Sequence, residues 1–194
     1  MREGTRISKW RNRLRWLTDS MILILVVLLI TRFTVQNFHI QGQSMEPTLH
    51  DQEFILVDKV AYLLHPPTRG DVIVFQFPRD PQEDLVKRII AVPGDVISVI
   101  NQAVIVNGIT LHETYINEND PYNPYPSFRD RIIEPGEYFV MGDNRGDSDD
   151  SRDWGLVSRQ SIIGRVAAVY WPTNANNFGL LPDASSVFAR VPSP

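Results

Sequence analysis

The sequence of 194 residues contains no cysteine. This absence excludes thiol nucleophiles, disulfide bonds and cysteine-ligated zinc sites. It does not identify a compartment, because proteins outside the cytoplasm can also lack disulfides. Histidine is scarce as well, and none of the four is placed in a way that suggests a general base, which disfavours a Ser-His-Asp triad. The four are His39, His50, His65 and His112.

Positive charge is scarce outside the N-terminus. Six basic residues against Glu3 give residues 1–16 a charge of +5, so the net charge of −4 leaves −9 for the rest of the chain. A nucleic-acid partner is therefore not expected, because phosphate binding requires a basic surface. The basic head instead suits an anionic membrane surface.

The only long apolar run spans residues 21–30, with Leu17 and residues 33–35 extending it. A buried core helix and a cleavable signal peptide are the alternatives to a membrane anchor. Six preceding basic residues disfavour the first, and the lack of a small-x-small site after the run disfavours the second. We expect a signal-anchor at residues 17–35, with residues 1–16 in the cytoplasm and the body outside it.

The body, residues 36–172, has the alternating and β-branched patterns of short strands. We expect a mainly β fold with coiled, antiparallel, barrel-like sheets. Asn107-Gly108 predicts a two-residue hairpin turn inside an insertion at about 101–136, and residues 117–130 look like an exposed loop. Residues 60–65 could form a helical turn, and 173–194 a loosely held tail. The expected strands are 54–57, 71–77, 85–92, 96–100, 103–111, 137–141 and 162–171.

Two residues suggest a nucleophile and its base: Ser44 in QGQSMEPTL and Lys87 in LVKRIIAVPGD. A serine needs a nearby base to lose its proton. A lysine, with an ordinary pKa of about 10.4, can act as that base only where burial lowers its pKa. Lys87 is either solvated at an edge or buried with a lowered pKa. Because side chains alternate along a strand, only one of Lys87 and Arg88 can point at the core.

The segment at 142–155, GDNRGDSDDSRDWG, has the composition of a tight, internally hydrogen-bonded turn. Its spacing does not fit an EF-hand calcium loop. The Arg-Gly-Asp tripeptide that it contains is too short to indicate adhesion. A merely solvated acidic loop remains open.

Four motifs in order resemble the bacterial type I signal peptidases (leader peptidases) with one N-terminal anchor. They are residues 42–49, GQSMEPTL; residues 69–73, RGDVI; residues 87–95, KRIIAVPGD; and residues 142–155. The resemblance implies a membrane-bound Ser/Lys endopeptidase that cuts preproteins after a small-x-small site and needs no cofactor.

The resemblance also implies roles for single residues. Ser44 would be the nucleophile and Lys87 the general base, with Lys87 facing the site and Arg88 facing away. Ser148 would hydrogen-bond and orient the lysine amine. Ion pairs Asp143–Arg88 and Asp150–Arg152 would hold the last motif against the lysine strand. Gly42 stands where some members have a serine that helps the oxyanion hole, which leaves the Ser44 backbone N–H as the main donor.

The implied partners are secretory preproteins and the lipid bilayer, and we expect a monomer. An extended peptide would add to a sheet edge. Apolar residues 171, 178, 180 and 181 are candidates for touching the bilayer. The expected substrate-binding residues are Met45, Pro47, Asp71, Val72 and Ile73.

Two alternatives remain. Self-cleaving repressor-type proteases share the catalytic pair but lack an anchor, so residues 1–35 disfavour them. A tethered β-domain that binds exported chains without cutting them would be expected to have lost Ser44 or Lys87.

Overall fold

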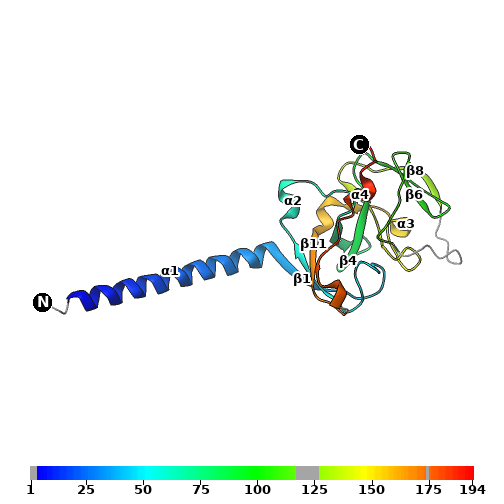
Figure 1. Cartoon of the computed structure of the whole chain (residues 1–194). Helices are drawn as coiled ribbons and strands as arrows, with labels where there is room; N and C mark the ends of the chain where they lie inside the picture. Colours follow the sequence, from blue (N-terminus) through cyan, green and yellow to red (C-terminus); the bar gives the residue numbers. More distant parts are fainter. Residues whose placement is uncertain (1–3, 117–126, 174) are drawn as a thin grey trace.

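A long N-terminal helix leads into a β domain. The computed structural model describes residues 4–116, 127–173 and 175–194. Helix α1 spans Gly4–Thr34 and projects away from the β domain (Figure 1). Its part at Arg15–Thr34 has a mean hydropathy of 1.9 and is not covered by the rest of the protein, so by length and composition it can cross a membrane. The helix passes directly into the first strand.

The larger sheet has eight antiparallel strands. The order is β1-β2-β11-β3-β4-β9-β10, with β12 beside β11. Strand β4 is therefore held between β3 and β9, and it carries the lysine at its centre. The bounds are β1 Val35–His39, β2 Phe54–Asp58, β3 Val72–Phe77, β4 Asp80–Ala91, β9 Glu137–Met141, β10 Val157–Ser158, β11 Ile162–Trp171 and β12 Gly179–Leu180.

The smaller sheet has four strands in the order β7-β6-β5-β8. Asn107 and Gly108 join β6 to β7, and both have positive φ angles, 50° and 78°. This is the backbone that a two-residue turn of the mirror-image type requires, so the predicted hairpin is confirmed. The bounds are β5 Val96–Ile100, β6 Ala103–Val106, β7 Ile109–Thr110 and β8 Phe128–Ile132.

Short helices fill the connections. They are α2 Ala61–Leu64, α3 Ser151–Trp154 and α4 Ser185–Phe188, with 3-10 turns at Arg159–Ser161 and Ala175–Asn177. The helical turn expected at 60–65 is confirmed as α2, and the mainly β fold with one N-terminal apolar helix is confirmed as well.

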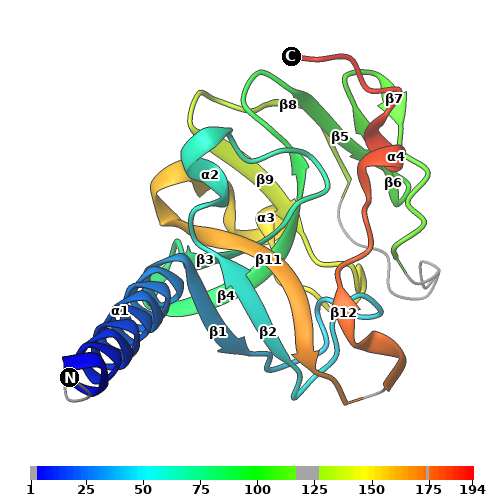
Figure 2. The same ribbon diagram turned by 60° about the vertical axis from the view of Figure 1, so that its left-hand side comes forward.

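The expectation of a loose C-terminal tail is wrong. Phe188 and Val191 are buried in the core cluster beneath the smaller sheet, and α4 lies beside β6 and β7 (Figure 2). The Pro192 carbonyl accepts hydrogen bonds from Arg69 and Asn107. Burying these few apolar residues stabilises the segment although they are too sparse to show a periodic pattern.

The loop expected at 117–130 is partly wrong. Residues 128–130 belong to β8, which pairs with β5. Residues 117–126 lie outside the described residues. The sequence did not predict β1, β10 or β12, and β4 starts five residues before the expected strand.

Candidate active site

Ser44 lies in the turn-rich connection between β1 and β2. Two buried apolar residues, Met45 and Leu49, fix this connection in the core, and the Leu49 N–H donates to the Met45 carbonyl. Asn144 holds it from the other side. Its backbone N–H donates to the Ser44 carbonyl at 3.0 Å, and its side-chain amide donates to the Gln43 carbonyl at 3.2 Å. The Ser44 side chain stays half-buried.

Lys87 reaches Ser44 from the centre of β4. The two residues are 43 positions apart in the chain, yet Lys87 Nζ and Ser44 Oγ are 2.7 Å apart. Only 4% of Lys87 is exposed. A neutral amine at that distance can accept the hydroxyl proton, as a general base must.

Burial lowers the pKa of Lys87, because it disfavours the charged ammonium. Asp150, Asp149 and Asp143 act in the opposite direction through their negative charge, and burial outweighs them. In the part of the chain that the structure describes, no carboxylate forms an ion pair with Lys87. The solvated alternative for this lysine is excluded.

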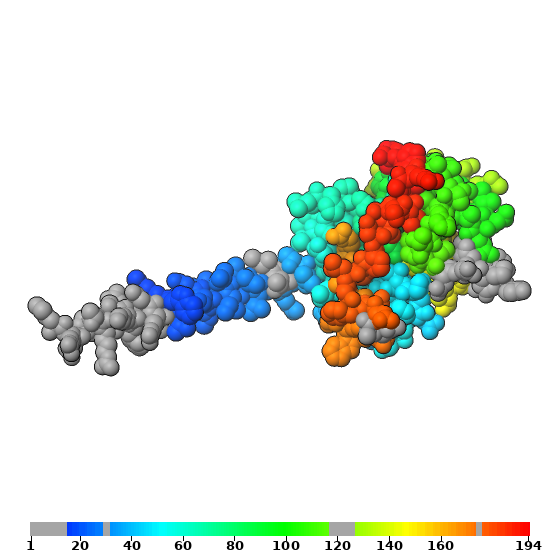
Figure 3. All heavy atoms as spheres, in the orientation of Figure 1, coloured from blue at the N-terminus to red at the C-terminus, as the bar shows by residue number. Residues whose placement is uncertain are grey.

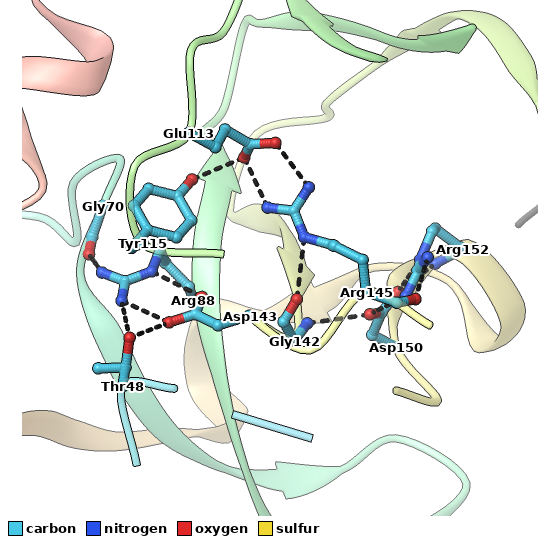
Figure 4. Close-up of polar contacts among 10 residues, drawn as sticks. All are labelled: Thr48, Gly70, Arg88, Glu113, Tyr115, Gly142, Asp143, Arg145, Asp150 and Arg152. Carbon is cyan, nitrogen blue, oxygen red and sulfur yellow. Dashed lines mark hydrogen bonds and ion pairs between the residues drawn. The ribbon is translucent and has the colours of Figure 1, made fainter. Parts of the chain in front are cut away.

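The expectation that only one of Lys87 and Arg88 can point at the core is wrong, because both side chains are buried. Arg88 is 2% exposed, against 4% for Lys87. Alternation does place the two side chains on opposite faces, but both faces of β4 are covered here. On its own face, Arg88 donates to both oxygens of Asp143 at 2.9 and 2.6 Å, to the Gly70 carbonyl and to the Thr48 hydroxyl (Figure 4). Arg88 therefore links β4 to three loops, those that contain Thr48, Gly70 and Asp143.

The segment at 142–155 contains the second expected ion pair. Arg152 donates to Asp150 at 2.8 and 2.7 Å, and Asp150 also accepts from the Gly142 N–H.

The hydrogen bond of Ser148 differs from the expectation. Its hydroxyl donates to Asp150 at 2.8 Å, and among the described contacts it makes no hydrogen bond to Lys87. Asp150 attracts this hydroxyl because a carboxylate is the stronger acceptor.

Gly142 packs directly against the nucleophile's backbone. A Cβ atom at this position would lie 2.4 Å from the Ser44 carbonyl oxygen and 2.2 Å from Ser148 Oγ. Any side chain here would push the two segments apart. The glycine therefore permits the close contact that sets the position of Ser44 relative to β4.

Two residues of this network were missed by the sequence. Glu113 accepts two hydrogen bonds from Arg145, and the Tyr115 hydroxyl donates to Glu113 at 2.7 Å. The Tyr115 ring stacks on the Arg88 guanidinium at 4.1 Å (Figure 4). Arg145 in turn donates to the Gly142 carbonyl at 2.9 Å. The connection that follows β7 thus contacts both Arg145, in the segment at 142–155, and Arg88, in β4. No local sequence pattern predicts these contacts.

A groove of about 340 Å³ opens beside Ser44 and Lys87. One wall is the end of β1 and the connection after it, and the other is the first half of β4. The part of β4 before Arg88 pairs with β3 along one edge, and no described strand pairs with its other edge. The lining residues are Phe38, His39, Ile40, Gln41, Gly42, Ser44, Met45, Val74, Gln82, Glu83, Asp84, Leu85, Val86 and Lys87.

Of the expected substrate-binding residues, only Met45 lines this groove. Pro47 borders a different cavity, and Asp71 and Val72 border a third. Ile73 is fully buried in the core. The reason is that β3 is a central strand, paired with β4 and β11, and so has no free edge to offer.

The backbone N–H of Ser44 has no acceptor among the described residues. It is thus available to an oxyanion. Gly42 has a φ angle of 97°, and a Cβ there would meet no atom within 4 Å, while its N–H donates to Asp51 at 2.8 Å. Within the described ranges, no group of three or more histidine, aspartate or glutamate residues could hold a metal ion.

Comparison with known proteins places the chain in a family. A family described as "Signal peptidase, peptidase S26" matches residues 13–171. A "Probable signal peptidase I-1" of Synechocystis sp. is 38% identical over 178 residues, which cover 88% of each chain. A "Signal peptidase IB" of Staphylococcus aureus is 31% identical over 187 residues, which cover 89% of this chain and 97% of the other.

A crystal structure of a signal peptidase I from Enterococcus faecalis is also similar, with 32% identity and a TM-score of 0.44. It covers 51% of this chain and 95% of the other. The family match spans most of the chain, including the anchor candidate and all four motifs. This chain therefore belongs to the signal peptidase family, peptidase S26.

Proposed function

We propose that this protein is a membrane-bound serine endopeptidase that removes N-terminal signal peptides from exported preproteins. The observation that supports it most directly is the 2.7 Å contact between Ser44 Oγ and the buried Lys87 Nζ. Family membership supplies the substrate class, and the contact supplies the chemistry. A binding-only domain would need neither the contact nor the lowered lysine pKa.

In this mechanism, neutral Lys87 takes the proton from the Ser44 hydroxyl as the serine oxygen attacks the scissile carbonyl carbon. The ammonium so formed then protonates the leaving amine, which breaks the peptide bond and leaves an acyl-enzyme. A water molecule, deprotonated by the same amine, attacks the ester and restores Ser44. The ammonium formed in that second attack returns its proton to the Ser44 oxygen as the ester bond breaks, so one buried amine serves as base and acid in turn.

The Ser44 backbone N–H would stabilise the oxyanion that forms at the carbonyl oxygen. Pre-oriented donors of this kind are worth about 10²–10³ in rate for each donor. Gly42 contributes no side-chain hydroxyl, and the space around its α-carbon is open. A substrate group or a water molecule can occupy that space and supply the second donor.

The substrate would bind as an extended strand along the free edge of β4. Such binding satisfies the main-chain hydrogen bonds, and alternate side chains then enter the groove. The groove next to Lys87 is lined by Met45, Val74 and Val86. The small side chains of a small-x-small cleavage site would pack against these apolar residues.

Helix α1 would span the membrane, with the basic segment 1–16 in the cytoplasm and the β domain outside, by the positive-inside rule. Arg32, near the end of the span, would extend to the interface. We further propose that the enzyme acts as a monomer.

The test is cleavage of a preprotein that carries an Ala-x-Ala site, with the products mapped by mass spectrometry. The full chain in detergent should make one cut after that site, and Ser44→Ala should make none. Ser186→Ala, which alters an exposed serine, is the matched control and should cut normally. A cut by Ser44→Ala would remove this serine from the mechanism, and no cut by any variant would contradict the assignment of a peptidase.

A further inference from the structure

The connection that carries Ser44 is closed at its two ends. We call residues 40–53 the nucleophile loop. The Ile40 N–H donates to the Glu53 carbonyl at 2.8 Å, and the Gln52 N–H donates to the Ile40 carbonyl at 3.0 Å. These bonds fix where the loop leaves the sheet and where it returns. The part between the two ends needs contacts of its own if the nucleophile is to stay in place.

One such contact is made by Glu53, whose side chain folds back inside the nucleophile loop. The side chain is fully buried, and its Oε2 atom accepts from the His50 N–H at 2.9 Å. Its Oε1 atom makes no hydrogen bond to any described residue, and His50 Nδ1 lies 3.6 Å from it. A buried carboxylate is costly unless donors compensate it. Each hydrogen bond that reaches Glu53 therefore bears on the stability of the loop.

Asn177 supplies a second hydrogen bond to Glu53 from outside the loop. It is the last residue of the 3-10 turn that follows β11. Its side-chain amide donates to Glu53 Oε2 at 2.7 Å, lies 3.3 Å from His50 Nδ1 and donates to the Thr48 carbonyl at 3.4 Å. All three partners belong to the nucleophile loop. Figure 3 shows the segment after β11, in orange, against the loop, in cyan.

Two asparagines from distant parts of the chain thus hold the nucleophile loop at two places. Asn144 donates to the Ser44 carbonyl and the neighbouring one, and Asn177 donates to Glu53 near the other end of the loop. The family match ends at residue 171, before Asn177. The second contact is therefore a feature of this chain that the match does not describe.

We propose that Asn177 is a positioning residue for the cleavage reaction and that it acts through Glu53. This inference rests on the proposed function and deepens it. The hydrogen bond to Glu53 holds the loop at the end away from Asn144, so that Ser44 Oγ stays 2.7 Å from Lys87 Nζ, within reach for proton transfer. Without this bond the loop can shift, and a displacement of about 1 Å in a reacting group can lower the rate about 100-fold.

Asn177→Asp tests the proposal, because it replaces the amide donor with a second carboxylate beside a buried one. Asn107→Asp is the matched control, since Asn107 donates its amide to the fully buried Asp95 at 2.8 Å in the smaller sheet. The double variant Glu53→Gln, Asn177→Asp reverses the polarity of the bond. The introduced amide can donate to the introduced carboxylate, and its oxygen can still accept from the His50 N–H.

We expect Asn177→Asp to lower kcat on a soluble peptide in detergent about 10- to 100-fold. The value of KM should rise less, because the edge of β4 that would bind the substrate is unchanged. At a temperature well below the unfolding midpoints of all variants, Asn107→Asp should keep the parent kcat, and the double variant should regain most of it. Equal losses in Asn177→Asp and Asn107→Asp would overturn the proposal, since general loosening would explain them. An unchanged kcat in Asn177→Asp, or no recovery in the double variant, would also overturn it.

Hydrogen exchange of the full chain in detergent tests the contact independently of cleavage. Inside the loop, the Leu49 N–H donates to Met45 and the Gln52 N–H donates to Ile40. We expect peptides that contain these amides to exchange faster in Asn177→Asp than in the parent or in the control variant. Unchanged exchange would overturn the proposal. If the parent itself does not cleave, the proposed function fails, whereas faster exchange in Asn177→Asp would still show that this side chain holds the loop.

Discussion

Four buried basic side chains belong to the catalytic strand and the segment at 142–155, and they fall into two groups. Arg88, Arg145 and Arg152 each form an ion pair with a carboxylate at hydrogen-bond distance: Asp143, Glu113 and Asp150. Lys87 is equally buried, yet its hydrogen-bond partner is the Ser44 hydroxyl, and none of the ion pairs in the described residues includes it.

The difference distinguishes the arginines, which hold the structure together, from the lysine that we propose takes part in the reaction. A buried charge is tolerated when a partner compensates it, and it cannot then give up its proton. Arginine is suited to this, since it stays protonated and offers planar, paired donors. A lysine buried without a partner instead loses its charge and becomes a base. The three arginines therefore hold the geometry around Lys87, while burial lowers the pKa of this lysine, as the proposed general base requires.

The largest effect should come from Lys87→Arg, which turns the uncompensated lysine into a permanent cation. Since the guanidinium cannot accept a proton, we expect cleavage to fall by at least about 10⁴-fold. The measurement is kcat/KM on a preprotein. Lys59→Arg, an exposed lysine, is the control and should leave the rate unchanged. Full activity of Lys87→Arg would end the assignment of the base.

Asp143→Asn tests the opposite group by removing the partner of a buried arginine. Arg88 would remain buried without its carboxylate, which costs about 3–5 kcal/mol of stability. We expect a clear fall in the midpoint of thermal unfolding of the full chain in detergent. The double variant Arg88→Met, Asp143→Leu should recover much of the loss. An Asp143→Asn protein as stable as the parent would show that the pair is not structural.

Glu113→Gln should have a slightly smaller effect, because the Glu113 side chain is 6% exposed, whereas that of Asp143 is fully buried. We expect a loss of stability at the lower end of the same range, about 3 kcal/mol. Arg145 also holds the Gly142 carbonyl, so kcat should fall more than KM rises. Glu113→Asp should restore part of kcat, and Glu134→Gln, an exposed glutamate, should change neither constant. A change in KM alone would contradict a role in positioning the nucleophile.

The sequence predicted the parts of the site that local motifs encode. Ser44 and Lys87 stand in short runs with recognisable neighbours, and the Asn107-Gly108 turn follows from backbone preference. The pairs Arg88–Asp143 and Arg152–Asp150 are present as expected from the resemblance.

The parts that were missed depend on contacts between distant segments. Glu113 meets Arg145 over 32 positions, and Phe188 reaches a core built mainly from β5, β6 and β9. Except for Met45, the residues expected to bind substrate do not line the groove beside Ser44. The sequence does not reveal which strands are central, and the structure shows that β3 lies between β4 and β11. The Ser148 hydroxyl donates to Asp150, two positions away, and this partner was not expected from the sequence.

The lowered pKa of Lys87 also predicts two pH dependences. Cleavage needs the neutral amine, so kcat/KM should rise with pH, about tenfold per unit below this pKa, and level off above it. The profile would be measured with a soluble peptide in detergent. A flat profile between about pH 6 and 10 would contradict a titrating lysine base if chemistry limits the rate.

The lowered pKa of Lys87 also makes the free energy of unfolding depend on pH. The direction is opposite to that of a lysine in an ion pair, whose folded pKa is raised and whose contribution to stability is lost as the pH rises. The unfolded chain holds a lysine proton up to a pKa of about 10.4, whereas the folded chain releases it earlier, so the free energy of unfolding rises with pH between the two values. Below the folded pKa, the free-energy cost of burying the charged Lys87 is present in full.

The variant Lys87→Met removes that cost and keeps the packing. We therefore expect this variant to be inactive yet to unfold at a higher temperature than the parent, with a difference that shrinks as the pH approaches 10.4. A difference that is independent of pH would mean that the gain comes from packing and that Lys87 bears no charge penalty.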